Sequence, residues 1–381
     1  MTNNNDKKIL NVPPLRFPEF TEEWKKCTID DLCEEFKSGK NIKADNILGE
    51  GEYPVFGGNG LRGYTDSYNH EGDYVLIGRQ GALCGNVRFV TGKTYITEHA
   101  IAAKATNDND IRFLKSLFIQ LNLGQFSDQS AQPGLAVNKL LKIETSVPSR
   151  IEQAKIASLL SIIDERITTQ NKIIEDLKKL KSAIIEEHYK HTQKQKACVA
   201  DLGVPFNVGN LSKEELSETG TSCVIYGELF TTYGEIINHV ESHTNKLDGM
   251  TLSKKGDLLF PSSTTVDALS LIAPSAINVD NVILGGDMFG IHINSGFNAQ
   301  YLSYYFNHLA KKQFAKYAKG STIIHLHYKD IEKAQLLLPC LVEQNRMAAC
   351  LVLLDEKIRI ESSHLQSVVK QKMYLLHQMF I

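Results

Sequence analysis

A glycine-rich stretch near the N-terminus carries the spacings that many cofactor-binding loops share. Residues 56–60 (FGGNG) fit the loose FxGxG pattern of S-adenosylmethionine pockets, and Gly58, Gly60 and Gly63 form a GxGxxG. Such a loop binds phosphate when a helix follows it, because the amides at the helix N-terminus then face the anion. Residues 64–72 are rich in turn formers instead, and no DPPY-like or NPPY-like catalytic tetrapeptide occurs. The stretch therefore predicts a β-turn loop without a cofactor.

Two further arrangements have the residue types of metal sites. His239 and His243 (HVESH) have metal-like spacing on an expected helix, but no third ligand is evident. Asp355-Glu356-Lys357 resembles the acidic motif of a metal-dependent nuclease, yet it aligns with Asp164-Glu165-Arg166 in a second copy of the same helix. Both acidic pairs are expected on the exposed flank of that helix. Because the chain also lacks a G-x-S-x-G elbow and a P-loop, we predict no catalytic residue and no metal ligand.

The third candidate chemistry is contact with a polyanion. Residues 288–329 contain no acidic residue, but they hold five lysines, five tyrosines and four histidines. The matching residues 111–127 carry Arg112 and Lys115 and also lack Asp and Glu. Basic stretches with interleaved aromatic residues suit phosphate contacts. A single basic helix is equally well explained as a solvated face, but two at corresponding places favour a polyanion.

Each basic stretch precedes one copy of a long repeat that organises the chain. Residues 148–189 align without a gap on residues 339–380. The matches include Pro148 with Pro339 and the dipeptide Glu-Gln at 152–153 with the same dipeptide at 343–344. The repeat divides the chain into two units of about 190 residues, each a globular part followed by a long helix.

Both copies of the repeat have the heptad pattern of a coiled coil. Apolar residues follow one another at alternating steps of four and three, which is the spacing of a seam between paired helices. The breaks in the seam coincide, since Gln170 and Lys181 match Glu361 and Lys372. Polar seam residues at matched places fix the register of a pair. We therefore predict two helices, each roughly 60 Å long, that pair with each other.

Length, charge and cysteine use place few limits on function. The 381 residues, 42% of them hydrophobic, suffice for two or three domains, and the net charge of −2 gives no global sign of nucleic-acid binding. The seven cysteines form no CxxC pair, which is typical of a reduced cytosolic protein. There is no apolar signal core and no apolar run of 18 residues, so we expect a cytoplasmic protein.

The globular parts are predicted to be mixed, with short strands between glycine-rich turns. In the first part we expect a disordered polar stretch at 1–11, an extended segment at 12–20, a short helix at 29–36, a small sheet over 53–90, a strand at 95–104, a helix at 111–123 and a strand at 143–147. In the second part we expect strands at 224–230 and 234–240 and a helix at 299–319. Residues 255–260 echo 71–76, and residues 285–291 take the place of 97–101.

Several motifs together resemble the specificity subunit of type I restriction–modification systems. They are an LRFPEF-like opening followed by a tryptophan, the loop YPVFGGNGLRGYTD (53–66), GDYVLIGRQGALCGNV (72–87), and a helix with the pattern P…EQ..IA..L…D, in a plan that is repeated once. The resemblance covers nearly the full chain. The second copy departs from it, because residues 341–346 keep only the EQ, and residues 260–263 (FPSS) replace residues 77–80 (IGRQ).

The resemblance implies an α+β fold with a pseudo-two-fold internal repeat. Residues 1–147 and 191–338 would be mixed α/β target recognition domains, and residues 148–190 and 339–381 would be helical spacers that pair as an antiparallel coiled coil. The chain would be a non-catalytic subunit that reads a bipartite, asymmetric site in double-stranded DNA. It would dock two adenine methyltransferase subunits and also restriction subunits, and these partners would bind S-adenosylmethionine, ATP and magnesium, while this chain binds no cofactor.

Candidate DNA-contacting residues follow from the chemistry of base edges, since arginine can hold guanine and Asn or Gln can hold adenine through two hydrogen bonds. In the first domain they are Asn59, Arg62, Tyr64, Arg79, Gln80 and Asn86. In the second domain they are Ser262, Ser263, Thr264, Thr265, Lys316, Lys319, Ser321, His325 and His327, some of which would contact only phosphates. A loop-stabilising or solvated role remains an equal alternative for each residue taken singly.

Two other classes of function stay open at this point. One is a coiled-coil scaffold with two protein-binding β modules and no role in nucleic-acid binding. The other is a self-sufficient methyltransferase or nuclease, which the missing cofactor and metal motifs disfavour. The target sequence itself does not follow from one chain, because base choice depends on loop geometry.

Overall fold

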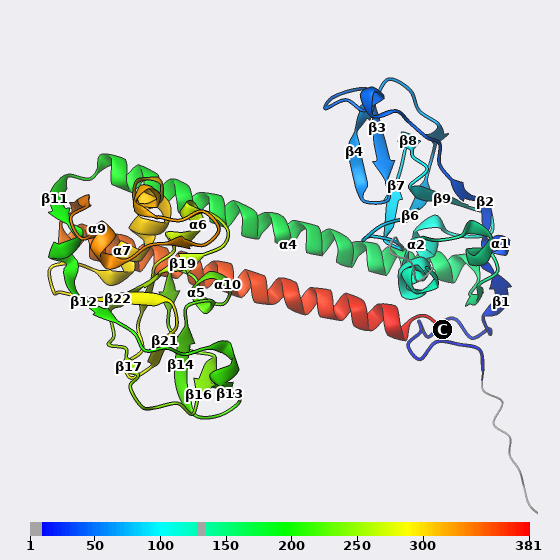
Figure 1. Cartoon of the computed structure of the whole chain (residues 1–381). Helices are drawn as coiled ribbons and strands as arrows, with labels where there is room; N and C mark the ends of the chain where they lie inside the picture. The colour runs from blue at the N-terminus through cyan, green and yellow to red at the C-terminus, as the bar shows by residue number, and fades with distance from the viewer. Residues whose placement is uncertain (1–9, 128–133) are drawn as a thin grey trace, which may run out of the picture. The chain divides into compact units, whose positions relative to one another are not determined.

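The computed structural model describes residues 10–127 and 134–381, which form two compact units (Figure 1). Unit 1 comprises the described residues up to Asn171 together with Ser363–Ile381, and unit 2 comprises Lys172–Ser362. The long helices α4 (Arg150–His191) and α10 (Leu341–Gln378) both cross this division. Each unit therefore contains a globular part and one half of each long helix. The expected disorder at 1–11 falls mainly on residues 1–9, which lie outside the described residues.

Unit 1 is built from two four-stranded sheets and a helix that covers one of them. The first sheet has the order β2 (Cys33–Ser38), β9 (Ala100–Ala105), β6 (Tyr74–Gly78) and β7 (Val87–Val90), all antiparallel. The second has the order β4 (Gly60–Thr65), β3 (Tyr53–Gly57), β8 (Lys93–Ile96) and β5 (His70–Glu71), with β3 and β8 parallel. Helix α2 (Ile111–Gln120) packs Phe113, Leu117 and Phe118 against Val75 and Ile77 of β6.

Short elements complete unit 1. Strands β1 (Lys25–Thr28) and β10 (Glu144–Val147) pair next to the start of α4. The short helices are α1 (Ile29–Leu32), η1 (Ala44–Asn46), η2 (Leu123–Phe126) and α3 (Val137–Leu140).

Unit 2 also contains two main sheets, each of five strands. One sheet has the order β12 (Gly203–Asn207), β22 (Met288–Ile293), β18 (Asp257–Pro261), β20 (Ser275–Ile277) and β15 (Ile236–Ile237). The other has the order β13 (Leu216–Ser217), β16 (Ser242–Thr244), β14 (Thr221–Ile225), β21 (Ile283–Gly285) and β17 (Thr251–Leu252). Two strand pairs flank them, β11 (Lys194–Cys198) with β24 (Gln335–Pro339) and β19 (Ser263–Thr264) with β23 (Ile324–His325).

The helical elements of unit 2 are short apart from the long pair. They are η3 (Val199–Leu202), η4 (Lys213–Glu215), α5 (Glu228–Thr231), α6 (Ala268–Leu271), α7 (Ala299–Tyr304), the π-helical η5 (Tyr305–Ala310), α8 (Lys311–Phe314), η6 (Ala315–Tyr317) and α9 (Tyr328–Ile331). The helix expected at 299–319 is thus interrupted by a π turn and ends in a 3₁₀ turn at Tyr317.

Four local predictions are wrong in detail. Residues 29–36 are helical only to Leu32, because Phe36 belongs to β2 and packs into the core. The strand expected at 95–104 is two strands, β8 and β9, separated by a turn. In unit 2, residues 224–230 pass from β14 into α5, and only Ile236 and Ile237 of 234–240 form a strand. Tertiary packing decided each of these short segments against local propensity.

A buried glutamine joins each globular part to its long helix. Gln153 accepts a hydrogen bond from the backbone N–H of Asp110 (2.9 Å) and donates to the carbonyl of Pro148 (3.0 Å). Its repeat partner Gln344 accepts from the N–H of Asn298 (3.0 Å) and donates to the carbonyl of Pro339 (2.8 Å). Asp110 and Asn298 are the N-caps of α2 and α7, so the EQ dipeptide of the repeat has the same structural role in both units.

Lysine–aspartate pairs join α4 to α10 within each unit. In unit 2, Lys181 Nζ lies 2.6 Å from Asp355 Oδ1, and in unit 1, Lys372 Nζ lies 2.5 Å from Asp164 Oδ1. The repeat equates the two lysines and the two aspartates. The prediction of polar seam residues that fix register is confirmed for Lys181 and Lys372. The prediction that both acidic pairs lie on the exposed flank is wrong for Asp164 and Asp355, because both aspartates bind the facing helix.

Further contacts show that the two helices run antiparallel within each unit. In unit 2, His188 contacts Glu343 (3.3 Å), so moving forward along α4 from Lys181 means moving backward along α10. Ile185 of α4 shares a core with Met347, Ala348 and Leu351 of α10. In unit 1, Ile156 and Leu160 share a core with Leu376 and Phe380. The predicted antiparallel coiled coil is therefore observed in both units.

Lys181 is the centre of a buried polar network. Its ammonium group also contacts Glu235 Oε1 (2.8 Å) and lies over the ring of Tyr304, whose hydroxyl donates to Asp355 (2.5 Å). Burial alone would raise the pKa of Glu235, but hydrogen bonds from His308 and Lys181 outweigh it and lower the pKa to about 2. In unit 1, Asp164 is the repeat partner of Asp355. Burial alone would raise the pKa of Asp164, but its contacts with Lys115 and Lys372 lower it.

We expect the Lys181→Met substitution to destabilise unit 2 by about 3 kcal/mol, because it leaves two carboxylates without their shared, buried cation. The side chain of Lys181 is 8% exposed, whereas that of Lys372 is 20% exposed, and Asp164 keeps Lys115. The matched control Lys372→Met should therefore cost about 1 kcal/mol or less. Thermal unfolding of both variants measures the difference, and equal losses would contradict this account.

Candidate functional site

Three loops of unit 1 meet at the end of β6. We call them the loop cluster of unit 1: the hairpin tip 58–59 between β3 and β4, the β6–β7 loop 79–86, and the turn 98–99 before β9. The N–H of Arg79 donates to the carbonyl of His99 (2.9 Å), and the N–H of Gly78 donates to that of Asn86 (2.8 Å). A Cβ atom on Gly58 would lie 2.7 Å from the carbonyl oxygen of His99, so the tip needs glycine to sit this close.

The structure brings most of the candidate residues of the first domain together. Asn59 is at the hairpin tip, while Arg79, Gln80 and Asn86 belong to the β6–β7 loop. All are exposed except Arg79, which is half-buried. Gln80 Oε1 lies 3.2 Å from His99 Nδ1. The loop 56–60 is a hairpin turn, as the sequence predicts.

Two candidates and two unpredicted residues lie along the neighbouring strands. Arg62 and Tyr64 are on β4, and the backbone of Tyr64 exchanges hydrogen bonds with Leu48, away from the tip. Sequence reasoning missed Arg88 on β7, whose guanidinium lies against Gly60, and His99. Arg88 comes to lie beside the glycine hairpin because β7 pairs with β6, and the sequence alone does not show this pairing.

Unit 2 has the same backbone junction with different side chains. The N–H of Ser262 donates to the carbonyl of Asp287 (2.8 Å), as Arg79 does to His99. The carbonyl of Ser262 accepts from the N–H of Leu326 (2.9 Å), as Arg79 accepts from Leu135 (2.9 Å). The next residue of each unit also forms a β-bridge: Ser263 pairs with His325 in unit 2, and Gln80 pairs with Gly134 in unit 1. The two units thus present different residues from one frame.

The candidates of the second domain are divided between buried and exposed positions. Ser262 and Ser263 are 4% and 7% exposed, which leaves little of either side chain at the surface. Thr264 is half-buried and accepts a hydrogen bond from the N–H of Val266, whereas Thr265 is exposed. The role of all four in DNA contact stays a prediction.

Three of the other candidates of unit 2, Lys319, His325 and His327, line a hollow of about 530 Å³. Its lining residues are Asp287, Lys319, Gly320, His325, His327 and Asp330. The rings of His325 and His327 are stacked with centroids 6.1 Å apart, and Lys319 pairs with Asp330. Lys316 and Ser321 are exposed on the same segment. We call this hollow the basic pocket of unit 2.

Three of the five tyrosines among the lysines are buried and form no reading surface. Tyr301, Tyr304 and Tyr305 are 3%, 1% and 4% exposed and belong to the core of unit 2. In the matching helix α2 of unit 1, Lys115 binds Asp164 of α4. The pattern of lysines with interleaved tyrosines therefore marks a packed helix, and the exposed lysines of unit 2 carry the positive charge of the segment.

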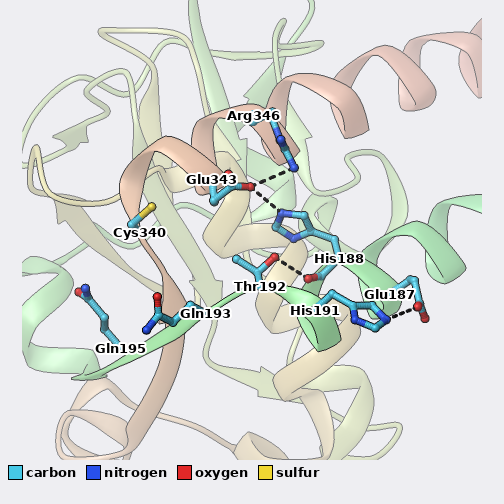
Figure 2. Close-up of a pocket in the computed structure, with 9 residues that line it drawn as sticks. All are labelled: Glu187, His188, His191, Thr192, Gln193, Gln195, Cys340, Glu343 and Arg346. Atoms are coloured by element: carbon cyan, nitrogen blue, oxygen red, sulfur yellow. Dashed lines mark hydrogen bonds and ion pairs between the residues drawn. The ribbon is translucent and has the colours of Figure 1, made fainter.

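A second hollow in unit 2, of about 690 Å³, lies where α4 ends and α10 begins (Figure 2). Glu343 contacts both His188 (3.3 Å) and Arg346 (3.1 Å), and His191 contacts Glu187 (2.5 Å). In unit 1 the repeat partner Glu152 holds Arg16 through two hydrogen bonds of 2.7 Å. These charges are paired with one another, so the hollow is a polar junction between helix ends.

Metal and membrane sites are not found among the described residues. Over 10–127 and 134–381, no group of three or more His, Cys, Asp or Glu side chains is placed to hold a metal ion. The helix expected at His239 and His243 is wrong, since His243 lies in β16 and His239 in the loop before it. Within the same ranges, no helix combines the length and apolar character that crossing a bilayer requires.

Comparison with known proteins identifies the family. The model of the type I restriction modification DNA specificity domain matches residues 21–179 and matches again at residues 198–371. This chain belongs to that family. The double match agrees with the internal repeat seen in the sequence, and a role in recognising DNA sequence follows from membership of this specificity family.

Individual relatives of this specificity protein support the same conclusion. It is 41% identical over 165 residues to the type I restriction enzyme EcoprrI specificity subunit of Escherichia coli, a match that covers 42% of this chain and 40% of that relative. It is 22% identical over 346 residues to a putative type I specificity subunit of Haemophilus influenzae, covering 86% of each chain. The crystal structure of an S subunit from M. genitalium superposes with a TM-score of 0.69 at 18% identity, over 97% of this chain and 99% of that one. At that identity the superposition shows the fold.

We expect Gly58→Ala to destabilise unit 1 of this specificity protein by about 1 to 3 kcal/mol, because the added methyl group overlaps a backbone oxygen that cannot move without opening the loop cluster. Gly49→Ala is the matched control, since a Cβ atom at Gly49 meets nothing within 4 Å. Thermal unfolding compares the two variants. Equal stability would show that the hairpin tip does not depend on this close approach.

Proposed function

We propose that this chain is the non-catalytic subunit that reads a bipartite, asymmetric DNA sequence for a type I restriction–modification complex. The observation that carries the proposal is the backbone junction shared by the two units. The same hydrogen bonds hold Arg79 beside His99 in unit 1 and Ser262 beside Asp287 in unit 2. One frame with two unlike sets of side chains suits two unlike half-sites.

The residues at the junctions have the chemistry that base and phosphate contacts require. In unit 1, Arg79 suits guanine, while Asn59, Gln80 and Asn86 suit adenine. In unit 2, the exposed Lys316 and Lys319 suit phosphates, which position a protein on DNA without reading its sequence. These assignments support a division of labour between a base-reading loop and a phosphate-binding segment.

The paired helices suit the role of spacer and docking surface. Helix α4 has 42 residues and α10 has 38, which correspond to about 63 and 57 Å at 1.5 Å per residue. We propose that the pair sets the distance between the half-sites and docks two methyltransferase subunits and the restriction subunits. In this proposal those partners bind S-adenosylmethionine, ATP and magnesium, this chain binds no cofactor, and the complex acts in the cytoplasm.

The salt dependence of duplex binding distinguishes this proposal from a protein-binding scaffold. A chain that neutralises six or more phosphates should lose about a thousandfold in affinity between 50 and 200 mM salt, because it releases condensed counterions. Fluorescence anisotropy with a labelled duplex measures this loss. Binding that is absent or independent of salt would favour the scaffold. Methylation mapping of a genome carrying the chain should also return a split motif with a fixed gap.

Arg79→Ala should relax base choice at one position of one half-site, because a bidentate contact to guanine is worth about 1 to 3 kcal/mol of discrimination. Selection of duplexes from a library randomised over both half-sites reads out the preference at every position. Arg150→Ala removes a different arginine of the same unit, an exposed one, and is the charge-matched control. If Arg79→Ala weakens binding equally for all sequences, Arg79 contacts phosphate.

A further inference from the structure

The basic pocket of unit 2 contains one carboxylate, that of Asp287, which forms no hydrogen bond or ion pair with the described residues around it. Asp287 is the last acidic residue before the acid-free residues 288–329, and it lies with Lys319, His325 and His327 around the hollow. A carboxylate in this place opposes phosphate binding, since it repels the DNA backbone. Such a residue on a DNA-binding surface calls for another role.

The two carboxylates of the pocket differ in their contacts. Asp330 is engaged, because Oδ1 accepts from Lys319 Nζ (2.5 Å) and Oδ2 accepts from the N–H of His327 (3.0 Å). Asp287 is half-buried, and within residues 10–127 and 134–381 its side chain makes no hydrogen bond or ion pair. Asp330 therefore shapes the pocket, while the oxygens of Asp287 remain available as acceptors.

The backbone around Asp287 is held firmly. Its carbonyl accepts from the N–H of Ser262 (2.8 Å), and the next residue, Met288, pairs with Pro261 in the central sheet. Gly286 before it has a φ of +90°, which fixes the turn out of β21. The carboxylate thus belongs to a rigid point directly before β22, an interior strand of its sheet, and such rigidity suits recognition of a single atom.

The repeat places Asp287 where His99 stands in the loop cluster of unit 1. The carbonyl of Asp287 accepts a hydrogen bond from the N–H of Ser262, the first residue after β18. The carbonyl of His99 likewise accepts from the N–H of Arg79, the first residue after β6. Position 99 offers an imidazole with Gln80 beside it (3.2 Å), whereas position 287 offers a free carboxylate. At this point unit 1 has an imidazole, which can donate a hydrogen bond, whereas unit 2 has a carboxylate, which can only accept one.

We propose that Asp287 is a specificity-determining residue that accepts a hydrogen bond from the exocyclic N4 amine of a cytosine in the major groove. Among the base edges of that groove, carboxylates pair with this donor. Lys319, which pairs with Asp330, and the stacked rings of His325 and His327 lie around the same hollow as this carboxylate. The inference rests on the proposed function and names the kind of base that unit 2 reads at one position.

The test uses the complex of the full chain with its methyltransferase subunits and duplexes randomised one position at a time. With Asp287→Asn and with Asp287→Ala, preference for cytosine at one position of one half-site should fall about tenfold, while the other half-site is read as before. Asp248→Asn, a loss of one exposed carboxylate elsewhere in unit 2, should leave every preference unchanged.

The outcomes separate this inference from the proposed function. A wild-type complex that shows no sequence preference overturns the proposed function. A wild-type complex that is selective, with both Asp287 variants folded and reading the same bases, overturns only the inference. Uniformly tighter binding of all sequences by both variants also overturns it, since the carboxylate then acts through charge alone. Circular dichroism shows whether each variant is folded. A folded variant should also keep the wild-type base preferences at the half-site that unit 1 reads.

Discussion

The pairing of a lysine on one long helix with an aspartate on the other is the constraint on which the rest of the structure depends. The heptad seam supplies apolar contact, but apolar seams tolerate shifts by a heptad, whereas Lys181 binds one specific carboxylate of α10, that of Asp355, and also Glu235 of the globular part. The same exchange occurs between Lys372 and Asp164. Because the repeat gives each helix both a lysine and an aspartate, one sequence pattern fixes register in both units.

Backbone groups supply one of the attachments between the globular parts and these helices. Gln153 and Gln344 bind the N-cap amides of α2 and α7, so the first turn of each of those helices is fixed on the long helix below it. Residues 79–80 and 262–263 then continue directly from the central strands of their sheets. The long helices keep matching residues in the two copies of the repeat, whereas the loops at the ends of the sheets differ between the two copies.

The sequence predicted the features that depend on periodicity. The gapless repeat, the paired helices and the polar positions of the seam all followed from spacing, as did the hairpin turn at residues 58–59. Prediction failed where partners come from distant segments. Tyr301 and its neighbours resembled part of a phosphate-binding stretch because the sequence does not show which side of α7 meets the core. Asp164 resembled a solvated residue because both of its cations, Lys115 and Lys372, belong to other helices.

Candidate site residues were predicted unevenly for the same reason. Arg79 and Gln80 were identifiable, since they directly follow a buried strand and precede a glycine-rich loop. Arg88, His99 and Asp287 were missed because each belongs to a neighbouring strand or turn that only the sheet topology brings to the same edge. Conversely, Ser262 and Ser263 have suitable side chains but are buried, and Ser263 belongs to β19, which pairs with β23.

The glutamine contacts have a consequence for how such a protein can change. Gln153 and Gln344 recognise a peptide N–H that any non-proline residue supplies, and neither selects a side chain of the globular part. A foreign domain grafted between the same strand pair, β11 and β24, would keep this contact if one of its helices began at the equivalent place. It would also have to supply partners for Lys181 and Asp355 of the long helices, which now bind Glu235 and Tyr304. The glutamine contacts are thus general for any domain, whereas the lysine and aspartate contacts are specific to the present one.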